Sequence, residues 1–293
     1  MKQKIAIVTG STGFIGSNLV QRLLSLGIKT AGLPRDLLLN PIELKEYIKS
    51  IKPDYIFHLA AYGNHSTQTD FNETIATNII KTAMLFSAIE NIKLEAFINF
   101  GSSSEYGKKD MPMSENTFLE PDTYYGATKA ASTLLGRAFA VQHAKSVVTV
   151  RPFSVYGEGE ADFRFIPTVI KSLVTNTTMP LDGRPMHDWI YVQDFIDGVM
   201  KVVKNADKLT GQVVNIGTGV QYSNDEVVNE LEQISGKQLL FDAFGYFRKY
   251  DNTFWVADNN KLLSLGWKPK HTLKEGLSLT YEYYQHRFKE KNS

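Results

Sequence analysis

The chain has 293 residues, 43% of them hydrophobic and 22% charged, a composition close to the globular average that argues against wholesale disorder. Lys and Arg number 32 against 31 Asp and Glu, so the net charge of +1 leaves no surplus of positive charge for binding nucleic acid or a membrane surface. The absence of cysteine excludes disulfides, thiolate nucleophiles, and zinc or iron–sulfur sites built on cysteine.

The first half of the chain alternates short apolar runs with longer amphipathic stretches. Strands are expected at 4–8, 29–33, 55–60, 96–101 and 146–152, and helices from a glycine-rich turn to about 26 and at 41–50, 70–90 and 125–142. Strict alternation of this kind is typical of βαβ units. It predicts an α/β protein with a doubly wound parallel sheet covered by helices on both faces.

The alternation weakens after about residue 157. Strands are expected at 189–192 and 213–216, and Ser223 and Glu226 form a capping-box pattern before an amphipathic helix. A closing helix is expected at 273–288. No linker or repeat separates the halves, so the second is expected to form a smaller lobe packed on the first. No apolar run approaches the ~20 residues of a membrane span, and we expect a cytoplasmic protein with no membrane or nucleic-acid partner.

A glycine-rich turn joins the first strand to the first helix, with Gly10, Gly13 and Gly16 in the spacing G-x-x-G-x-x-G. Glycine lets a backbone approach a pyrophosphate closely, and the helix N-terminus supplies free N–H groups and a partial positive charge. This context predicts dinucleotide binding. The candidate residues are Gly10, Thr12, Gly13, Phe14, Ile15 and Gly16.

The second strand runs into Arg35, Asp36 and Leu37, where the adenosine ribose of a dinucleotide is expected. A guanidinium there can bind the 2′-phosphate of NADP, whereas a carboxylate can accept a hydrogen bond from the 2′-hydroxyl of NAD. Arg35 comes first along the chain. The sequence therefore slightly favours NADP over NAD.

Tyr125 and Lys129 are four residues apart on an expected helix. Four residues correspond to about 400° of rotation, so the two side chains share one face, whereas Tyr124 is out of phase with Lys129. A tyrosine with its ordinary pKa of ~10 is a poor base. A nearby ammonium and an oxidised nicotinamide ring would lower that pKa, which makes the pair a candidate for proton transfer.

Three serines, Ser102, Ser103 and Ser104, follow the expected strand 96–101 directly. Ligands of open α/β sheets bind beyond the carboxyl ends of the strands. A hydroxyl at this point can hydrogen-bond the substrate oxygen whose proton Tyr125 moves. The glycine turn, the serines and the Tyr–Lys pair follow one another in the order that such a site requires.

These three elements together resemble the extended short-chain dehydrogenase/reductase superfamily, in its NAD-dependent epimerase/dehydratase group, over nearly the whole chain. Further segments carry the resemblance: His58-Leu59-Ala60-Ala61, Ser102-Ser103-Ser104-Glu105-Tyr106-Gly107, Arg151 to Gly157, Asp188 to Asp194, Asn215 to Gly219 and Leu265 to Pro269. The resemblance implies a Rossmann-like core over 1–160 and about 187–219. A smaller α+β substrate lobe is implied over about 161–186 and 220–293.

The resemblance also implies a nucleotide-diphosphate sugar as substrate, hydride exchange with NAD or NADP at sugar C4, and a homodimer formed through helices 70–90 and 125–142. Ser102, Tyr125 and Lys129 are then catalytic. Further cofactor contacts are implied at Leu59, Ala60, Ala61, Asn78 and Pro152. Substrate contacts are implied at Ser103, Ser104, Ser154, Arg184, His187, Arg248 and Asp251, with Arg184 compensating for the His187 that replaces a usual arginine. The six histidines lack metal-ligand spacing, and no metal is expected.

Departures from the family pattern narrow the chemistry. Family 4,6-dehydratases carry acids just after the catalytic hydroxyl, where this chain has Ser103 and Ser104. Glu105 comes one position later and is expected to face the other side of an extended segment. GDP-fucose synthases carry a cysteine where this chain has Ser104. These differences favour a 4-epimerase or a 4-ketoreductase. The alternatives are a 4,6-dehydratase and a catalytically silent NADP-binding sensor or scaffold.

Overall fold

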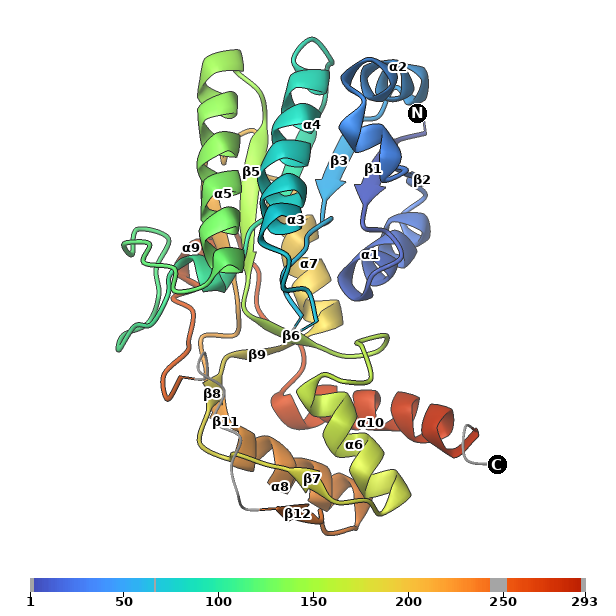
Figure 1. Ribbon diagram of the computed structural model, residues 1–293, viewed down its shortest axis with the longest axis vertical. Helices are drawn as coiled ribbons and strands as arrows, with labels where there is room; N and C mark the ends of the chain where they lie inside the picture. Colours follow the sequence, from blue (N-terminus) through green and yellow to red (C-terminus); the bar gives the residue numbers. More distant parts are fainter. Residues whose placement is uncertain (1–2, 66, 243–251, 291–293) are drawn as a thin grey trace.

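The computed structural model describes residues 3–65, 67–242 and 252–290 (Figure 1). Its main sheet joins six parallel strands in the order β10-β5-β4-β3-β1-β2. The strands are β1 (Ile5–Thr9), β2 (Lys29–Gly32), β3 (Tyr55–His58), β4 (Ala96–Phe100), β5 (Val147–Pro152) and β10 (Val213–Ile216). The strand order reverses at β1, between β2 and β3, and such a switch point is where ligands bind in this architecture. The predicted doubly wound α/β fold is confirmed.

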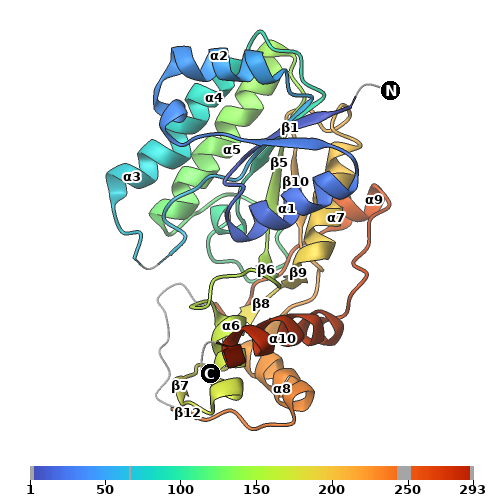
Figure 2. The ribbon, with the colours of Figure 1, turned by 90° about the vertical axis from the view of Figure 1, so that its right-hand side faces the viewer.

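Helices cover both faces of the sheet (Figure 2). On one face, α1 (Phe14–Ser25) contacts α7 (Val192–Val203). On the other, α4 (Lys81–Ile89) contacts both α2 (Pro41–Ile51) and α5 (Tyr124–His143). Strands β4 and β5 consist mostly of buried apolar residues, because helices cover both faces of the sheet and leave neither face to water. Of the described helices, none is both long enough and apolar enough to span a bilayer.

The helix expected at 70–90 is present but irregular. Asp70 caps α3 (Phe71–Ile75), the π-helical segment Ala76–Ile80 follows, and α4 then continues the same helical path. Regular spacing in the sequence does not reveal such a wider turn, which is common near functional sites. Here it contains the buried side chain of Asn78.

The C-terminal part packs three helices together: α6 (Phe165–Thr175), α8 (Asn224–Ser235) and α10 (Leu273–Glu290). Short strand pairs border them, formed by β7 (Met179–Pro180) with β12 (Phe241–Asp242) and by β8 (Met186–His187) with β11 (Tyr222–Ser223). The capping box of Ser223 and Glu226 is confirmed at the start of α8. The sequence analysis placed no helix at α6 or α7.

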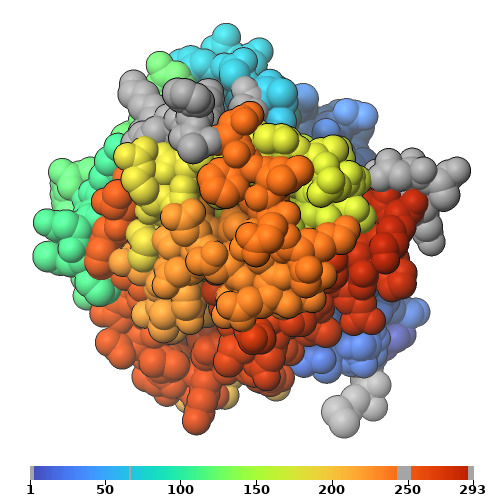
Figure 3. Space-filling view, turned by 90° about the horizontal axis from the view of Figure 1, so that it is seen from below, coloured from blue at the N-terminus to red at the C-terminus, as the bar shows by residue number. Residues whose placement is uncertain are grey.

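The two parts of the molecule share one hydrophobic core, which runs from Ala6 and Val8 in β1 to Phe288 in α10. The pair β6 (Ser154–Tyr156) and β9 (Trp189–Tyr191) lies where the chain passes from the sheet to the lobe. The short helix α9 (Asn260–Ser264) contacts β10, so part of the range 220–293 packs on the sheet side. Seen from below, the C-terminal half forms most of the face shown in Figure 3.

Candidate active site

The glycine turn lies at the carboxyl end of β1 and is packed tightly. Gly10 has a φ of +68°, which favours glycine, and a Cβ built on it would lie 3.1 Å from the Ala60 backbone nitrogen. A Cβ on Gly16 would lie 2.0 Å from the Gly10 carbonyl oxygen. Gly13 caps α1 without any side-chain hydrogen bond, which leaves the first-turn N–H groups of the helix for an anion. The turn therefore fits the pyrophosphate of a dinucleotide.

Gly16→Ala is expected to weaken dinucleotide binding at least about tenfold, because the added methyl group overlaps backbone atoms that cannot move away separately. Isothermal titration with NAD and NADP measures the loss. Gly136→Ala in α5 is the matched control, since the neighbours of its added Cβ lie 3.3 Å or more away. Equal affinity of the Gly16 variant and the native protein would show that the turn does not bind the cofactor.

Arg35 and Asp36 are both exposed just beyond the end of β2. Arg35 precedes a 3₁₀ helix, Asp36–Leu39, that also contains Leu37. The tight approach of Gly10 to Leu59 and Ala60 brings the loop after β3 against the glycine turn. Ala61 follows as an exposed residue of the same loop. The cofactor residues expected after β1, β2 and β3 thus lie at one edge of the sheet.

Buried hydroxyls fix the orientation of His58 below this edge. Thr9 Oγ1 accepts a hydrogen bond from the Ala60 N–H and lies 2.9 Å from His58 Nδ1. Thr82 Oγ1 donates to the Asn78 carbonyl oxygen and lies 2.9 Å from His58 Nε2. Because each hydroxyl has one proton, Thr9 donates to Nδ1 and Nε2–H donates to Thr82. Burial lowers the pKa of His58 to about 3, so the ring is neutral and structural.

The Asn78 side chain bonds to other parts of the protein. Its amide nitrogen donates to the Tyr62 carbonyl oxygen at 2.8 Å and to Thr128 Oγ1 at 2.9 Å, and its oxygen accepts from the Tyr62 N–H. Thr128 in turn donates to the Tyr125 carbonyl oxygen. Asn78 therefore braces the loop after β3 against the start of α5. The direct cofactor contact expected from the resemblance stays a prediction.

Ser102 and Tyr125 face each other across the junction of β4 and α5. A Cβ on Gly126 would lie 2.4 Å from the Ser104 carbonyl oxygen, so glycine beside Tyr125 allows the helix to pack directly on the serine turn. The Ser102 hydroxyl lies close enough to the Tyr125 phenol to lower the pKa of that phenol. The phenol therefore points toward the serine turn at the carboxyl end of the sheet.

The pKa of Tyr125 is nevertheless raised above its ordinary value. Burial is the largest cause, and the charge of Glu105 adds to it, while Ser102 and Arg164 act in the opposite direction. The sequence predicted that Lys129, together with an oxidised nicotinamide, would lower this pKa. In the protein alone, burial raises it instead. The spacing of two residues on a helix shows only whether their side chains share a face. The pKa of the phenol also depends on how far the surrounding segments exclude water from it, and the spacing does not show this.

Lys129 is 3% exposed and lies one turn after Tyr125 in α5. Burial lowers its pKa to about 8, and the negative charge of Glu105 partly offsets that effect. Its charge also contributes to lowering the pKa of His58. The ammonium thus lies near His58 at the end of β3, and its contact with the nicotinamide ribose stays a prediction.

Glu105 does not lie in an extended segment, which corrects the sequence-based expectation. Ser102 caps a 3₁₀ helix, Ser103–Glu105, and Glu105 closes a capping box with it. The carboxylate is 0% exposed and pairs with Arg151 through Nε at 2.9 Å and Nη2 at 2.8 Å. It is therefore not available as an acid that expels water from a sugar.

The expected substrate residues are distributed over several elements. Ser103 is buried and accepts a hydrogen bond from Trp255 Nε1 at 3.2 Å, and Ser104 donates its N–H to Ser102 Oγ. Ser154 Oγ lies 3.3 Å from His187 Nδ1 where β6 meets the lobe. Arg184 forms a bidentate ion pair with Asp182 and has an exposed side chain. Pro152 ends β5, beside Ile216 of β10. Arg248 and Asp251 lie outside the described residues.

Arg164 is a site residue that the sequence analysis missed. It caps α6, and its Nη2 donates to the Asn64 carbonyl oxygen at 2.9 Å, which joins the lobe to the loop after β3. Its neighbour Phe163 packs on His65 with ring centroids 3.9 Å apart. The charge of Arg164 acts on the Tyr125 phenol and also on the buried carboxyl of Glu160. No motif signals this residue, because the contacts form between segments about 100 residues apart.

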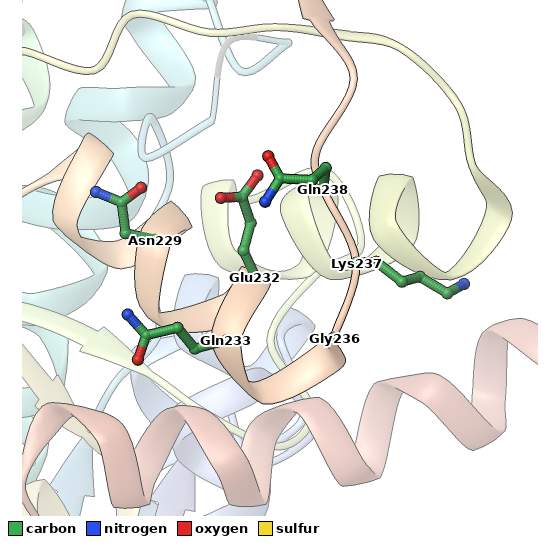
Figure 4. Close-up of a pocket in the computed structure, with 6 residues that line it drawn as sticks. All are labelled: Asn229, Glu232, Gln233, Gly236, Lys237 and Gln238. Atoms are coloured by element: carbon green, nitrogen blue, oxygen red, sulfur yellow. The ribbon is translucent and has the colours of Figure 1, made fainter.

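A separate surface hollow at the end of α8 does not belong to this site (Figure 4). It is lined by Asn229, Glu232, Gln233, Gly236, Lys237 and Gln238. Lys237 Nζ donates to the Leu173 carbonyl oxygen, and Glu232 accepts from the Leu239 N–H. Its two charged groups are therefore engaged with the backbone.

Residues 6–217 match the family model of the NAD dependent epimerase/dehydratase family. CDP-abequose synthase of Salmonella typhimurium is 29% identical, over 94% of this chain and 96% of that protein. An uncharacterized UDP-glucose epimerase of Bacillus subtilis is 28% identical, over 94% and 96%. Among solved structures, UDP-glucuronic acid 4-epimerase from Bacillus cereus, in complex with UDP-glucuronic acid and NAD, has a TM-score of 0.87 at 28% identity, covering 97% of this chain and 99% of that one.

Proposed function

The chain belongs to the NAD dependent epimerase/dehydratase family, and on that premise we propose that it acts at C4 of a nucleotide-diphosphate sugar as a 4-epimerase. The observation that carries this proposal is the packing of α5 on the serine turn, where the Ser102 hydroxyl lies close enough to lower the pKa of the Tyr125 phenol, with buried Lys129 one helical turn further along α5. The likeness to a solved UDP-sugar 4-epimerase over almost the whole chain supports it.

In this proposal the residues of the site divide the work. The dinucleotide, bound at the glycine turn, supplies the hydride acceptor for C4. Tyr125 accepts the proton of the O4 hydroxyl as the keto group forms and returns it afterwards. Ser102 donates a hydrogen bond to the same oxygen. Lys129 places positive charge below the phenol and holds the nicotinamide ribose, and both effects favour the phenolate form of Tyr125.

Dehydration is disfavoured by what surrounds the serine turn. Ser103 and Ser104 have no acidic group, and the carboxylate that follows them, that of Glu105, is buried against Arg151. Loss of water from C5 and C6 needs an acid and a base at those carbons. The 4,6-dehydratase alternative is therefore the less favoured reading of this site.

Incubation of the purified protein with UDP-, dTDP-, CDP- and GDP-sugars tests the proposal, with products separated by chromatography. An epimerase interconverts C4 epimers without net change in the dinucleotide, whereas a ketoreductase oxidises NADPH in proportion to the 4-keto sugar added. Dinucleotide binding without turnover of any sugar would favour the sensor or scaffold. Formation of a 4-keto-6-deoxy sugar would show that the protein is a 4,6-dehydratase instead.

We keep NADP as the proposed dinucleotide because Arg35 is exposed at the end of β2, although Asp36 beside it suits the 2′-hydroxyl of NAD. Arg35→Gln is expected to weaken NADP binding about tenfold and to leave NAD binding unchanged, since a bidentate contact to the 2′-phosphate is lost. Isothermal titration with both dinucleotides measures this. Arg137→Gln, on α5, is the control. Tighter binding of NAD than of NADP by the native protein would contradict the preference.

We also propose a homodimer formed by the helical stretch of residues 71–89 and by α5. Leu134 and Val141 on α5 expose 58% and 72% of their surface, and Ile80 exposes 44% just before α4. Large apolar side chains exposed along one helix are typical of interfaces. The mass in solution, measured by light scattering, distinguishes a dimer from a monomer.

A further inference from the structure

We infer that Glu105 is a positioning residue of this site, which fixes the backbone and the hydroxyl of Ser102 beneath Tyr125 and takes no proton itself. The inference rests on the proposed function, because it assigns Glu105 to the same chemistry at C4.

The hydrogen-bonding capacity of the carboxylate is fully used. Oε2 accepts from Nε and Nη2 of Arg151 at 2.9 and 2.8 Å. Oε1 accepts from the Ser102 N–H at 2.8 Å and from Thr133 Oγ1 at 3.0 Å. The Arg151 guanidinium also lies 4.5 Å from the centre of the Tyr106 ring. Of this buried pair, the Glu105 carboxylate is satisfied on every side, whereas Arg151 Nη1 is buried without a partner, and losing one member of such a pair is costly.

These four bonds join the three elements that build the site. Ser102 follows β4, Thr133 lies two turns after Tyr125 in α5, and Arg151 belongs to β5. The approach is so close that a Cβ on Gly101 would lie 2.3 Å from Glu105 Oε1. Glycine at 101 is therefore needed for the carboxylate to reach the Ser102 amide. The Glu105 side chain therefore ties the serine turn to the helix that carries Tyr125, in addition to the direct packing of Gly126 on that turn.

The bonds also determine where the Ser102 proton points. Ser102 Oγ accepts from the Ser104 N–H at 3.1 Å, within the turn that Glu105 closes. A hydroxyl that accepts on this side has its one proton free to be donated elsewhere, and the nearby Tyr125 phenol, whose pKa Ser102 lowers, can receive it. Without Glu105, the Ser102 amide loses its acceptor and the turn loses half of its capping box.

The charge of Glu105 has a second, separable effect. It raises the pKa of Tyr125 and that of Lys129, whereas Arg164 and Ser102 lower the pKa of Tyr125. His58, which also faces Lys129, is neutral. Removal of the negative charge is therefore expected to move the pH dependence of turnover to lower pH, whatever happens to the geometry.

The test is a double-mutant cycle with Glu105→Gln and Ser102→Ala. The quantity compared is kcat at its pH-independent maximum, because the effect of the lost charge then appears only in the pH profile. Glu105→Gln alone is expected to lower kcat about tenfold, with KM and dinucleotide affinity within roughly twofold of native. In the Ser102→Ala background it is expected to change kcat less than about twofold, because the group that it positions is gone. The same loss in both backgrounds, or no loss alone, overturns the inference.

Two further variants keep the test decisive. If Glu105→Gln does not fold, the double variant Glu105→Met with Arg151→Met removes both charges and leaves none unpaired. A folded double variant with native kcat overturns the inference. Glu115→Gln is the matched control, since Glu115 also accepts a backbone N–H, that of Asn215 at 2.9 Å, but lies outside the site. Its kcat and pH profile are expected to remain native.

A separate measurement distinguishes failure of this inference from failure of the proposed function. If the native protein turns over no nucleotide sugar, the proposed function is wrong. Amide hydrogen exchange still tests whether Glu105 positions the serine turn. The Ser102 and Ser104 amides are expected to exchange at least about tenfold faster in the Glu105→Met, Arg151→Met variant, which has no acceptor for the Ser102 N–H, while the Ile98 amide in β4 is unchanged. Unchanged protection of both serine amides overturns the inference.

Discussion

Tyr125→Phe is expected to lower turnover more than about a hundredfold while dinucleotide binding stays within about twofold of native. The phenyl ring keeps the packing of α5 against the serine turn, but no group remains to take the O4 proton. Steady-state kinetics with the sugar identified by the substrate screen gives the first value, and titration with the dinucleotide gives the second.

The neighbouring tyrosine provides a matched control for this variant. Tyr124 is 66% exposed and packs only on Phe71 among the described ring contacts, with centroids 4.5 Å apart. Tyr124→Phe is expected to retain native turnover. Equal loss of turnover and of dinucleotide binding in Tyr125→Phe would assign that residue a structural role instead.

Lys129→Met is expected to lower turnover more than about a hundredfold and, at pH 7, to raise the melting temperature by a few degrees. The ammonium is needed to favour the phenolate, but it is buried, and its desolvation destabilises the folded protein. Methionine fills a similar volume without that cost. Kinetics and thermal unfolding, each followed as a function of pH, measure the two effects.

The pH dependence of the stabilisation follows from the lowered pKa. Below the folded pKa of about 8 the ammonium is charged in both states, so the native protein bears the full desolvation cost. Between about 8 and the usual 10.5 the folded protein loses this proton first, and the advantage of Lys129→Met fades. Lys49→Met, at an exposed lysine of α2 paired with Glu46, is the control. A variant less stable than native at pH 7 would show that the charge of Lys129 is well compensated.

Features with local sequence signals could be predicted before the structure was known. The glycine turn requires close backbone contact between Gly10 and Gly16, which are only six residues apart, so the spacing carries the information. The common face of Tyr125 and Lys129 follows from helical periodicity. The parallel sheet follows from alternating strands and helices, because crossover connections allow little else.

The pKa values and the orientations of the site residues could not be predicted from the sequence. The π-helical turn at Asn78, the 3₁₀ turn that buries Glu105 against Arg151, and the arrival of Arg164 beside Tyr125 all depend on contacts between distant segments. The same holds for the raised pKa of Tyr125. Motif spacing shows which side chains can share a face, but the pKa and the orientation of each depend on desolvation and on hydrogen-bond partners, and these exist only once the chain is packed.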